Sequence, residues 1–198
     1  MWHRGSELLD SPAILRRVGI RPGWHVADLG CGSLGHFVFP AARLVGGMGK
    51  VYAVDIQRPA LKAIESSARA AQLWNIHPVW GDFERPRGTT LPDEIADLTV
   101  LSNALYLAKH PEAAVAEAMR LTQPGGFVLV IEWNPDSAVL GPALDQRISE
   151  RAVSDHFAAH ATQWSDRFDA GEHHYALLLQ KSDGNGEPTV ISVSNTFE

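Results

Sequence analysis

Apolar positions along this chain follow two alternating patterns. Short, nearly continuous apolar runs predict five buried strands, at 24–29, 51–56, 76–80, 97–102 and 127–132. Between them, apolar residues with helical spacing predict helices at 37–44, 59–73 and 111–121. A further helix is expected before the first strand, opened by Pro12 with Ser11 as its cap and ended by Gly19.

The order of these segments indicates the fold class. Strands that alternate with helices, and are apolar on both faces, are typical of a parallel sheet covered by helices on each side. After Pro142 the pattern changes to a helix over 143–160 and two strands, 161–168 and 172–180, joined through Gly171. So short a link predicts an antiparallel hairpin at the end of the sheet. We therefore expect an α/β, doubly wound, three-layer sandwich.

Length and composition agree with one domain. The chain has 198 residues, of which 45% are hydrophobic and 20% charged. We expect a single domain over 1–181 and a flexible polar tail over 182–198, in which 190–193 is a candidate late strand. Cys31 is the only cysteine, which excludes an internal disulfide and a multi-cysteine metal site.

The lengths of the apolar runs and the net charge indicate where the protein is located and which partners it can bind. No apolar run reaches the roughly 20 residues of a membrane span, and the first residues lack the apolar core of a signal peptide. We therefore expect a soluble, cytoplasmic protein. The net charge of −6 disfavours a broad grip on a nucleic-acid backbone.

A glycine-rich turn follows the first strand. Gly30, Gly32 and Gly35 lie where that strand passes into a helix, so a ligand can approach the backbone there. The spacing fits a dinucleotide, which would place its diphosphate at this turn. Asp28 favours a different ligand, because a carboxylate at this point repels a diphosphate and attracts an ammonium group. The amino-acid end of S-adenosylmethionine carries such an ammonium.

Three further polar residues follow later strands. Asp55 lies 27 residues after Asp28, one strand-helix-strand step along, and can accept hydrogen bonds from ribose hydroxyls. Asp82 lies 27 residues further on, can accept from an adenine amino group, and precedes Phe83, which can pack on the adenine. Asn103 follows the fourth strand and is expected beside the sulfonium.

The chain resembles the class I S-adenosylmethionine-dependent methyltransferases, and within them the ubiquinone/menaquinone-biosynthesis group. The resemblance spans residues 12–181 and includes VADLGCG, GKVYAVDI, GDFE, ADLTVLSNALY and FVLVIEW, in that order. It implies a seven-stranded sheet with an antiparallel last strand and S-adenosylmethionine as cofactor. It also implies cofactor contacts at Asp28, Gly30, Cys31, Gly32, Asp55, Ile56, Asp82, Phe83 and Asn103. The chain departs from the family at Leu34, where a glycine is usual.

The candidate catalytic residues are Glu132, at the end of the fifth strand, and His36, at the start of the second helix. His173 and His174 begin the last strand, where only one of them can face the site, and Trp133 is a candidate wall. No metal site is expected. The expected partner is a small-molecule acceptor that takes the methyl group on a phenolic or enolic carbon or oxygen.

Several alternatives stay open. An RNA or protein methyltransferase would share the cofactor. A nicotinamide-dependent oxidoreductase would share the glycines and Asp55, but not Asp28. A non-catalytic cofactor-binding subunit would have the same fold without the activity. The sequence also leaves homodimer formation open.

Overall fold

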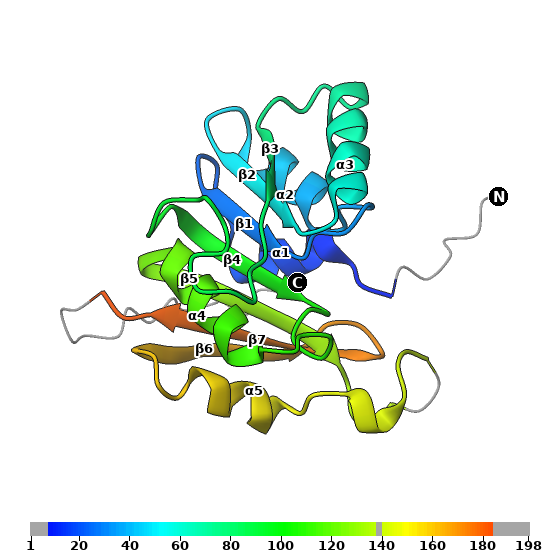
Figure 1. Ribbon diagram of the computed structural model, residues 1–198, viewed down its shortest axis with the longest axis vertical. Coiled ribbons are helices and arrows are strands. Elements are labelled where there is room, and N and C mark those ends of the chain that lie inside the picture. Colours follow the sequence, from blue (N-terminus) through cyan, green and yellow to red (C-terminus); the bar gives the residue numbers. More distant parts are fainter. Residues whose placement is uncertain (1–7, 138–139, 184–198) are drawn as a thin grey trace, which may run out of the picture.

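In the computed structural model, which describes residues 8–137 and 140–183, seven strands form one sheet in the order β3-β2-β1-β4-β5-β7-β6 (Figure 1). The strands are β1 (His25–Leu29), β2 (Lys50–Asp55), β3 (Ile76–Trp80), β4 (Ala96–Ser102), β5 (Thr122–Trp133), β6 (Thr162–Asp169) and β7 (His174–Lys181). Neighbours from β3 to β5 pair in parallel, whereas β7 is antiparallel to both β5 and β6. The predicted sheet and its terminal hairpin are confirmed.

Helices cover both faces of the sheet, which makes three layers (Figure 1). Helices α1 (Ser11–Val18), α2 (Val38–Val45) and α3 (Arg58–Ala70) pack through one apolar cluster on one face. Helices α4 (Pro111–Leu121) and α5 (Glu150–Phe157) pack through a second cluster on the other. Alternate strand residues feed the two clusters, as the side-chain period of two requires. Both faces are therefore buried, as the continuous apolar runs predicted.

The cap of α1 differs from the prediction. Asp10, not Ser11, accepts a hydrogen bond from the backbone N–H of Ala13 (3.0 Å). The Ser11 hydroxyl instead donates to the carbonyl oxygen of His36 (2.7 Å). Ser11 therefore ties the first helix to the segment that follows the glycine turn.

The helix expected over 143–160 was wrong in its first half. Only a single 3-10 turn, η1 (Leu144–Gln146), forms there, and α5 starts after Ser149, whose hydroxyl accepts from the backbone N–H of Ala152 (3.2 Å). The guanidinium of Arg147 donates to loop carbonyls instead of lying on a helix face. Tertiary hydrogen bonds thus override a segment with helical periodicity.

Two predictions fall partly or wholly outside the described residues. The candidate strand at 190–193 lies there, as does nearly all of the tail. Over the described part of the chain, the helices are all too short or too polar to cross a bilayer.

Candidate functional site

A cavity of about 320 Å³ opens where the carboxyl ends of β1, β4 and β5 meet the start of β7. Ligands of open α/β sheets bind at this edge. The cavity is lined by Leu8, Leu9, Asp28, Gly30, Cys31, His36, Phe37, Ser102, Asn103, Trp133 and His174. Five predicted site residues, at positions 28, 30, 31, 36 and 103, are thus brought together in one place.

Asp28 is the acidic group of this cavity. Its side chain is only 3% exposed, yet it borders the cavity. Burial, and secondly the negative charge of Asp55, raise the pKa of Asp28 to about 7. A cation that entered the cavity would stabilise the ionised form of this carboxylate. Asp28 therefore has the position and the charge that an ammonium ligand requires.

The glycine turn is held by β2. The N–H groups of Gly30 and Cys31 both donate to the carbonyl oxygen of Val54 (2.9 and 3.1 Å). The N–H of Gly32 donates to the Asp55 carboxylate (2.9 Å). Gly30 has φ +81°, a conformation that favours glycine, and this keeps the backbone bare beside the cavity. These three amides are therefore used inside the protein, and the turn is a preformed wall.

Asp55 has a double role in this geometry. Besides Gly32, its carboxylate accepts from the N–H of Gln57 (2.8 Å). Each carboxylate oxygen can accept more than one hydrogen bond, so the group can still receive hydroxyl donors. Asp55 thus fixes the turn between β2 and α3 and has acceptor capacity left, although it is not among the residues that line the cavity.

A second hollow, of about 650 Å³, lies further along the same edge of the sheet. Ile56 and Asp82 both line it. The Asp82 carboxylate pairs with Arg85 (2.9 Å) and accepts from the N–H of Glu84 (3.1 Å). Phe83 packs over the turn, because a Cβ atom added at Gly30 would lie 3.5 Å from its ring. Of the residues predicted for the nucleoside, Asp82 therefore lines this hollow, whereas Asp55 and Phe83 are not among its lining residues.

On the far wall of the cavity, Asn103, Trp133 and His174 form one group. Asn103 Nδ2 donates to Nε2 of His174 (3.1 Å), and the rings of Trp133 and His174 lie 4.1 Å apart. Asn103 has φ +51°, an uncommon value for a residue other than glycine, which is typical of functional loops. Asn103 Oδ1 and His174 Nδ1 are buried, with no hydrogen-bond partner among the described residues. The expectation that one histidine of the pair faces the site is met by His174.

The two candidate catalytic residues differ in placement. His36 borders the cavity, and its Nε2 donates to the carbonyl oxygen of Leu9 (3.0 Å). Glu132 is 0% exposed and is not among the lining residues. One of its carboxylate oxygens accepts from the N–H groups of Ala104 and Leu105 (3.1 and 2.7 Å). Burial raises the pKa of Glu132 to about 7. The structure thus gives Glu132 a place behind the loop that carries Asn103.

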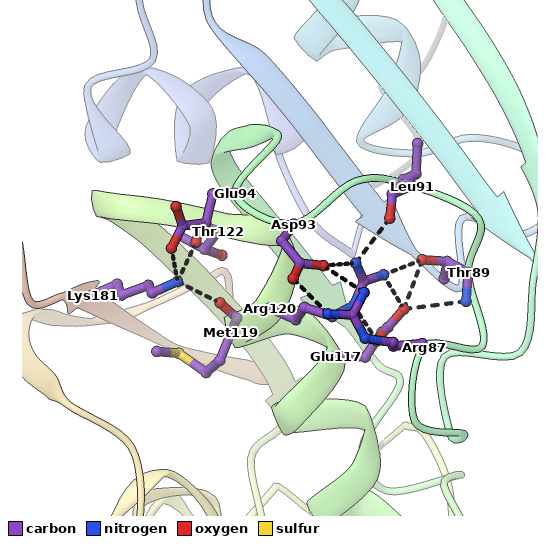
Figure 2. A network of polar contacts seen from close by, with 10 residues as sticks. All are labelled: Arg87, Thr89, Leu91, Asp93, Glu94, Glu117, Met119, Arg120, Thr122 and Lys181. Carbon is purple, nitrogen blue, oxygen red and sulfur yellow. Dashed lines mark hydrogen bonds and ion pairs between the residues drawn. The ribbon is translucent and has the colours of Figure 1, made fainter.

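The loop over 84–93, one of the segments available to cover a substrate, is held down by α4 (Figure 2). Arg120 donates to the carbonyl oxygen of Leu91 (2.8 Å), to Thr89 (3.0 Å) and to Asp93 (2.6 Å). It also pairs with buried Glu117 (2.7 Å). Burial by itself would raise the pKa of Glu117, but hydrogen bonds from Arg120 and Thr89 lower it overall. Arg120 therefore fixes this loop against α4.

The loop after β5 is organised by Arg147. Its guanidinium donates to the carbonyl oxygens of Asn134, Ser137, Leu140 and Pro142. Gly141 lies against the Trp133 ring, where an added Cβ would come within 2.5 Å of a ring carbon. This segment therefore supports the tryptophan that forms the wall of the cavity.

Sequence reasoning missed several lining residues, namely Leu8, Leu9, Phe37 and Ser102. Leu8 and Leu9 precede the first helix and carry no motif. Leu34, which replaces the usual glycine, is 83% exposed and outside the lining, so it does not fill the cavity.

Comparison with known proteins agrees with this geometry. Residues 20–182 match a family model described as a methyltransferase domain. The chain is 31% identical over 157 residues to a ubiquinone/menaquinone biosynthesis C-methyltransferase, UbiE, of Cupriavidus taiwanensis, covering 73% of this chain and 62% of that protein. It is 30% identical over 135 residues to the UbiE of Shewanella pealeana, covering 68% of this chain and 49% of that one. The chain thus spans half to three fifths of these relatives' length.

Solved structures show the same fold. A SAM-dependent methyltransferase from Aquifex aeolicus superposes with a TM-score of 0.80 at 22% identity, covering 88% of this chain and 90% of that one. A putative type 11 methyltransferase from Sulfolobus solfataricus gives 0.73 at 20% identity, covering 93% and 99%.

Proposed function

Because this chain belongs to the methyltransferase-domain family, we propose that it transfers a methyl group from S-adenosylmethionine to a small organic acceptor. The observation that carries the proposal is Asp28, a buried carboxylate on the cavity wall beside the glycine turn. An ammonium group is the ligand that such a carboxylate prefers, and a diphosphate is the ligand that it repels. This favours the methyltransferase over a nicotinamide-dependent oxidoreductase.

The chemistry of the predicted residues supports S-adenosylmethionine as the cofactor. Asp28 would hold the ammonium, Gly30 and Cys31 would face the methionine chain, and Asp55 would receive the ribose hydroxyls. Ile56 and Asp82 would flank the adenine from the second hollow, and Phe83 would approach it from its place against Gly30. Gly32 would keep Asp55 in place. When bound, S-adenosylmethionine supplies an electrophilic methyl group on a sulfonium.

The chain's own contribution is orientation and exclusion of water. Trp133, Phe37 and Leu9 give the cavity apolar walls that a flat acceptor can pack against. Alignment of an acceptor with the methyl group can supply most of the rate of such a transfer. His36, whose Nε2 carries the proton that Leu9 accepts, keeps Nδ1 as a base for an acceptor proton. We assign Glu132 the role of a positioning residue.

The type of acceptor and the location of the enzyme are part of the same proposal. We propose a phenolic or enolic acceptor, because the relatives in the comparison are named as C-methyltransferases of quinone biosynthesis. We place the enzyme in the cytoplasm, and we leave homodimer formation to a measurement of mass in solution.

Calorimetric titration tests the proposal. We expect S-adenosylhomocysteine to bind the wild-type protein and to lose at least about tenfold in affinity in Asp28→Asn, whereas NADH should not bind. Labelled methyl transfer into fractions of small metabolites, but not into RNA or protein, should follow. Binding of S-adenosylhomocysteine with no transfer to any fraction would favour the non-catalytic subunit, and tight NADH binding would refute the proposal.

A further inference from the structure

The charge of the acceptor cavity is set by an unusual combination of groups. Its polar lining residues are Asp28, Ser102, Asn103, His36 and His174, and it has no lysine or arginine among its lining residues. A carboxylate or phosphate on the acceptor would therefore meet Asp28 with no lysine or arginine among the described lining residues. Of those lining residues, only the two histidines could supply a positive charge. The Arg147 guanidinium is not a lining residue and lies 5.8 Å from the centre of the Trp133 ring.

His174 is held in its neutral form by its surroundings. Its Nε2 accepts a hydrogen bond from the Asn103 amide, so that nitrogen carries no proton. The side chain is 1% exposed, and the rings packed around it include Trp133 at 4.1 Å. Burial, with secondary contributions from His173, Arg147 and His36, lowers the pKa of His174 to about 4. The neighbouring carboxylate of Glu172 lies 3.9 Å from Nε2 of His173, the other histidine of the pair.

This neutrality matters because the proposed donor is a cation. A positive charge on the cavity wall would repel a sulfonium bound in the same cavity, and the repulsion would be strong in so dry a place. The neutral ring also has one N–H group that no described residue accepts from. With Nε2 occupied, the ring proton is on Nδ1, which is buried and has no partner among the described residues. A buried donor without a partner is costly, so a ligand oxygen that reaches it is favoured.

We propose that His174, fixed by Asn103 against Trp133, is the specificity-determining residue of the acceptor cavity, and that it selects an uncharged, flat, oxygen-bearing acceptor over an acid. This inference rests on the proposed function and deepens it. His174 admits the sulfonium because it carries no charge, and it distinguishes acceptors through its Nδ1 donor. It takes no proton from the acceptor, since its free nitrogen is already protonated.

The test uses three flat probes of similar size: 2-naphthol, 2-naphthoate and naphthalene. Each is titrated at pH 7.5 by ligand-observed NMR into the full chain saturated with S-adenosylhomocysteine. For the wild type we expect 2-naphthol to bind at least about tenfold more tightly than 2-naphthoate, and more tightly than naphthalene. Equal binding of the acid and the alcohol, or no binding of any probe, would overturn the inference.

Three substitutions separate a specificity role from a structural one. His174→Lys should remove or reverse the preference for the alcohol over the acid. It should also weaken S-adenosylmethionine at least about tenfold more than S-adenosylhomocysteine, because only the former carries the sulfonium charge. His174→Phe should erase the preference for 2-naphthol over naphthalene, and His174→Gln should retain it. These are ratios between ligands, which a loss of stability alone does not change.

His77→Phe is the matched control, since His77 is exposed on β3 and lies outside the cavity lining. It should leave every ratio unchanged. If His174→Lys does not fold, the comparison of His174→Phe with His174→Gln decides. Unchanged ratios in His174→Phe, or in His174→Lys where it folds, would refute the inference. Since S-adenosylhomocysteine binding to the wild type is measured first, failure of the proposed function shows separately, as loss of that binding.

Discussion

The Asp55 carboxylate accepts a hydrogen bond from the backbone N–H of Gly32 at 2.9 Å, across the gap between β2 and the glycine turn. Asp55, which we propose as the ribose acceptor, therefore also holds the glycine turn in place. Its second oxygen accepts from the N–H of Gln57 (2.8 Å), so both oxygens hold backbone. A substitution of Asp55 is therefore expected to change the local structure as well as the binding that we propose for it.

We expect Asp55→Asn to lose one of these two backbone bonds, because an amide has only one acceptor oxygen. The free energy of unfolding should fall by about 1–3 kcal/mol, and affinity for S-adenosylhomocysteine by at least about tenfold. Urea denaturation and calorimetry measure the two effects. Asp155→Asn, on the exposed side of α5, is the control and should change neither. Retained affinity in Asp55→Asn would remove Asp55 from the cofactor site.

Asp28→Asn should make the protein without ligand more stable at alkaline pH. The pKa of this carboxyl is raised from 3.8 to about 7 on folding, so its ionisation opposes folding. Wild-type stability from this group is present below about pH 4, falls as the pH rises to 7, and stays lost above it. The variant avoids that loss, which corresponds to at most about 4 kcal/mol.

Denaturation at pH 5 and pH 8 checks the sign. The advantage of Asp28→Asn over wild type should be larger at pH 8, while stabilisation by a fixed concentration of S-adenosylhomocysteine should be larger in the wild type. An advantage that is independent of pH would mean that the carboxylate is not the source.

Much of the fold is readable from local signals. Strand β3 and helix α4 occur at the predicted residues, since Pro111 opens the helix and apolar runs define the strands. The wrong helix after Pro142 depended on a distant contact. Arg147 donates to carbonyls of the loop after β5, and no periodicity in 143–160 encodes that.

The part of the site formed by residues adjacent in sequence was predictable. The part formed by contacts between residues of different strands was not. Asp28 and the glycines are adjacent in sequence, so their chemistry could be inferred. The contact of Trp133 with His174 depends on the antiparallel register of β5 and β7, which pairs these two residues across about 40 positions of chain. Side-chain alternation at the end of β5 also sends Glu132 away from the cavity and Trp133 toward it.

Glu132→Gln should retain methyl transfer within about tenfold of wild type, because the amide oxygen can still accept from Ala104 and Leu105. A general base at this position would instead lose about 10²–10⁴-fold in kcat. Glu132→Ala leaves both N–H groups without their acceptor and should cost about 2–4 kcal/mol of stability. Steady-state kinetics of the glutamine variant decides between the two roles.

Arg120→Met should destabilise the protein by about 3–5 kcal/mol, because it leaves the buried Glu117 carboxylate without its cation. The double variant with Glu117→Gln should recover part of this loss, as measured by urea denaturation. Arg85→Ala, which removes an exposed ion pair to Asp82, is the contrast and should cost less than about 1 kcal/mol. Equal effects of the two arginine substitutions would contradict a structural role for the network in Figure 2.

Arg147→Lys should loosen the loop after β5 while the fold stays intact. One ammonium group cannot reach carbonyl oxygens that the planar guanidinium bonds on several sides, and those of Asn134 and Leu140 lie 2.6 Å from it now. This loop supports Trp133 through Gly141. The substitution should therefore weaken binding of the acceptor and leave binding of the cofactor unchanged. We expect faster amide exchange around Leu140 and weaker binding of 2-naphthol, with S-adenosylhomocysteine affinity within about twofold of wild type. An equal loss of affinity for both ligands would mean that Arg147 supports the sheet edge as a whole. Unchanged affinity for both would mean that other contacts hold the loop, such as the hydrogen bond between Ser137 and His173 (2.7 Å).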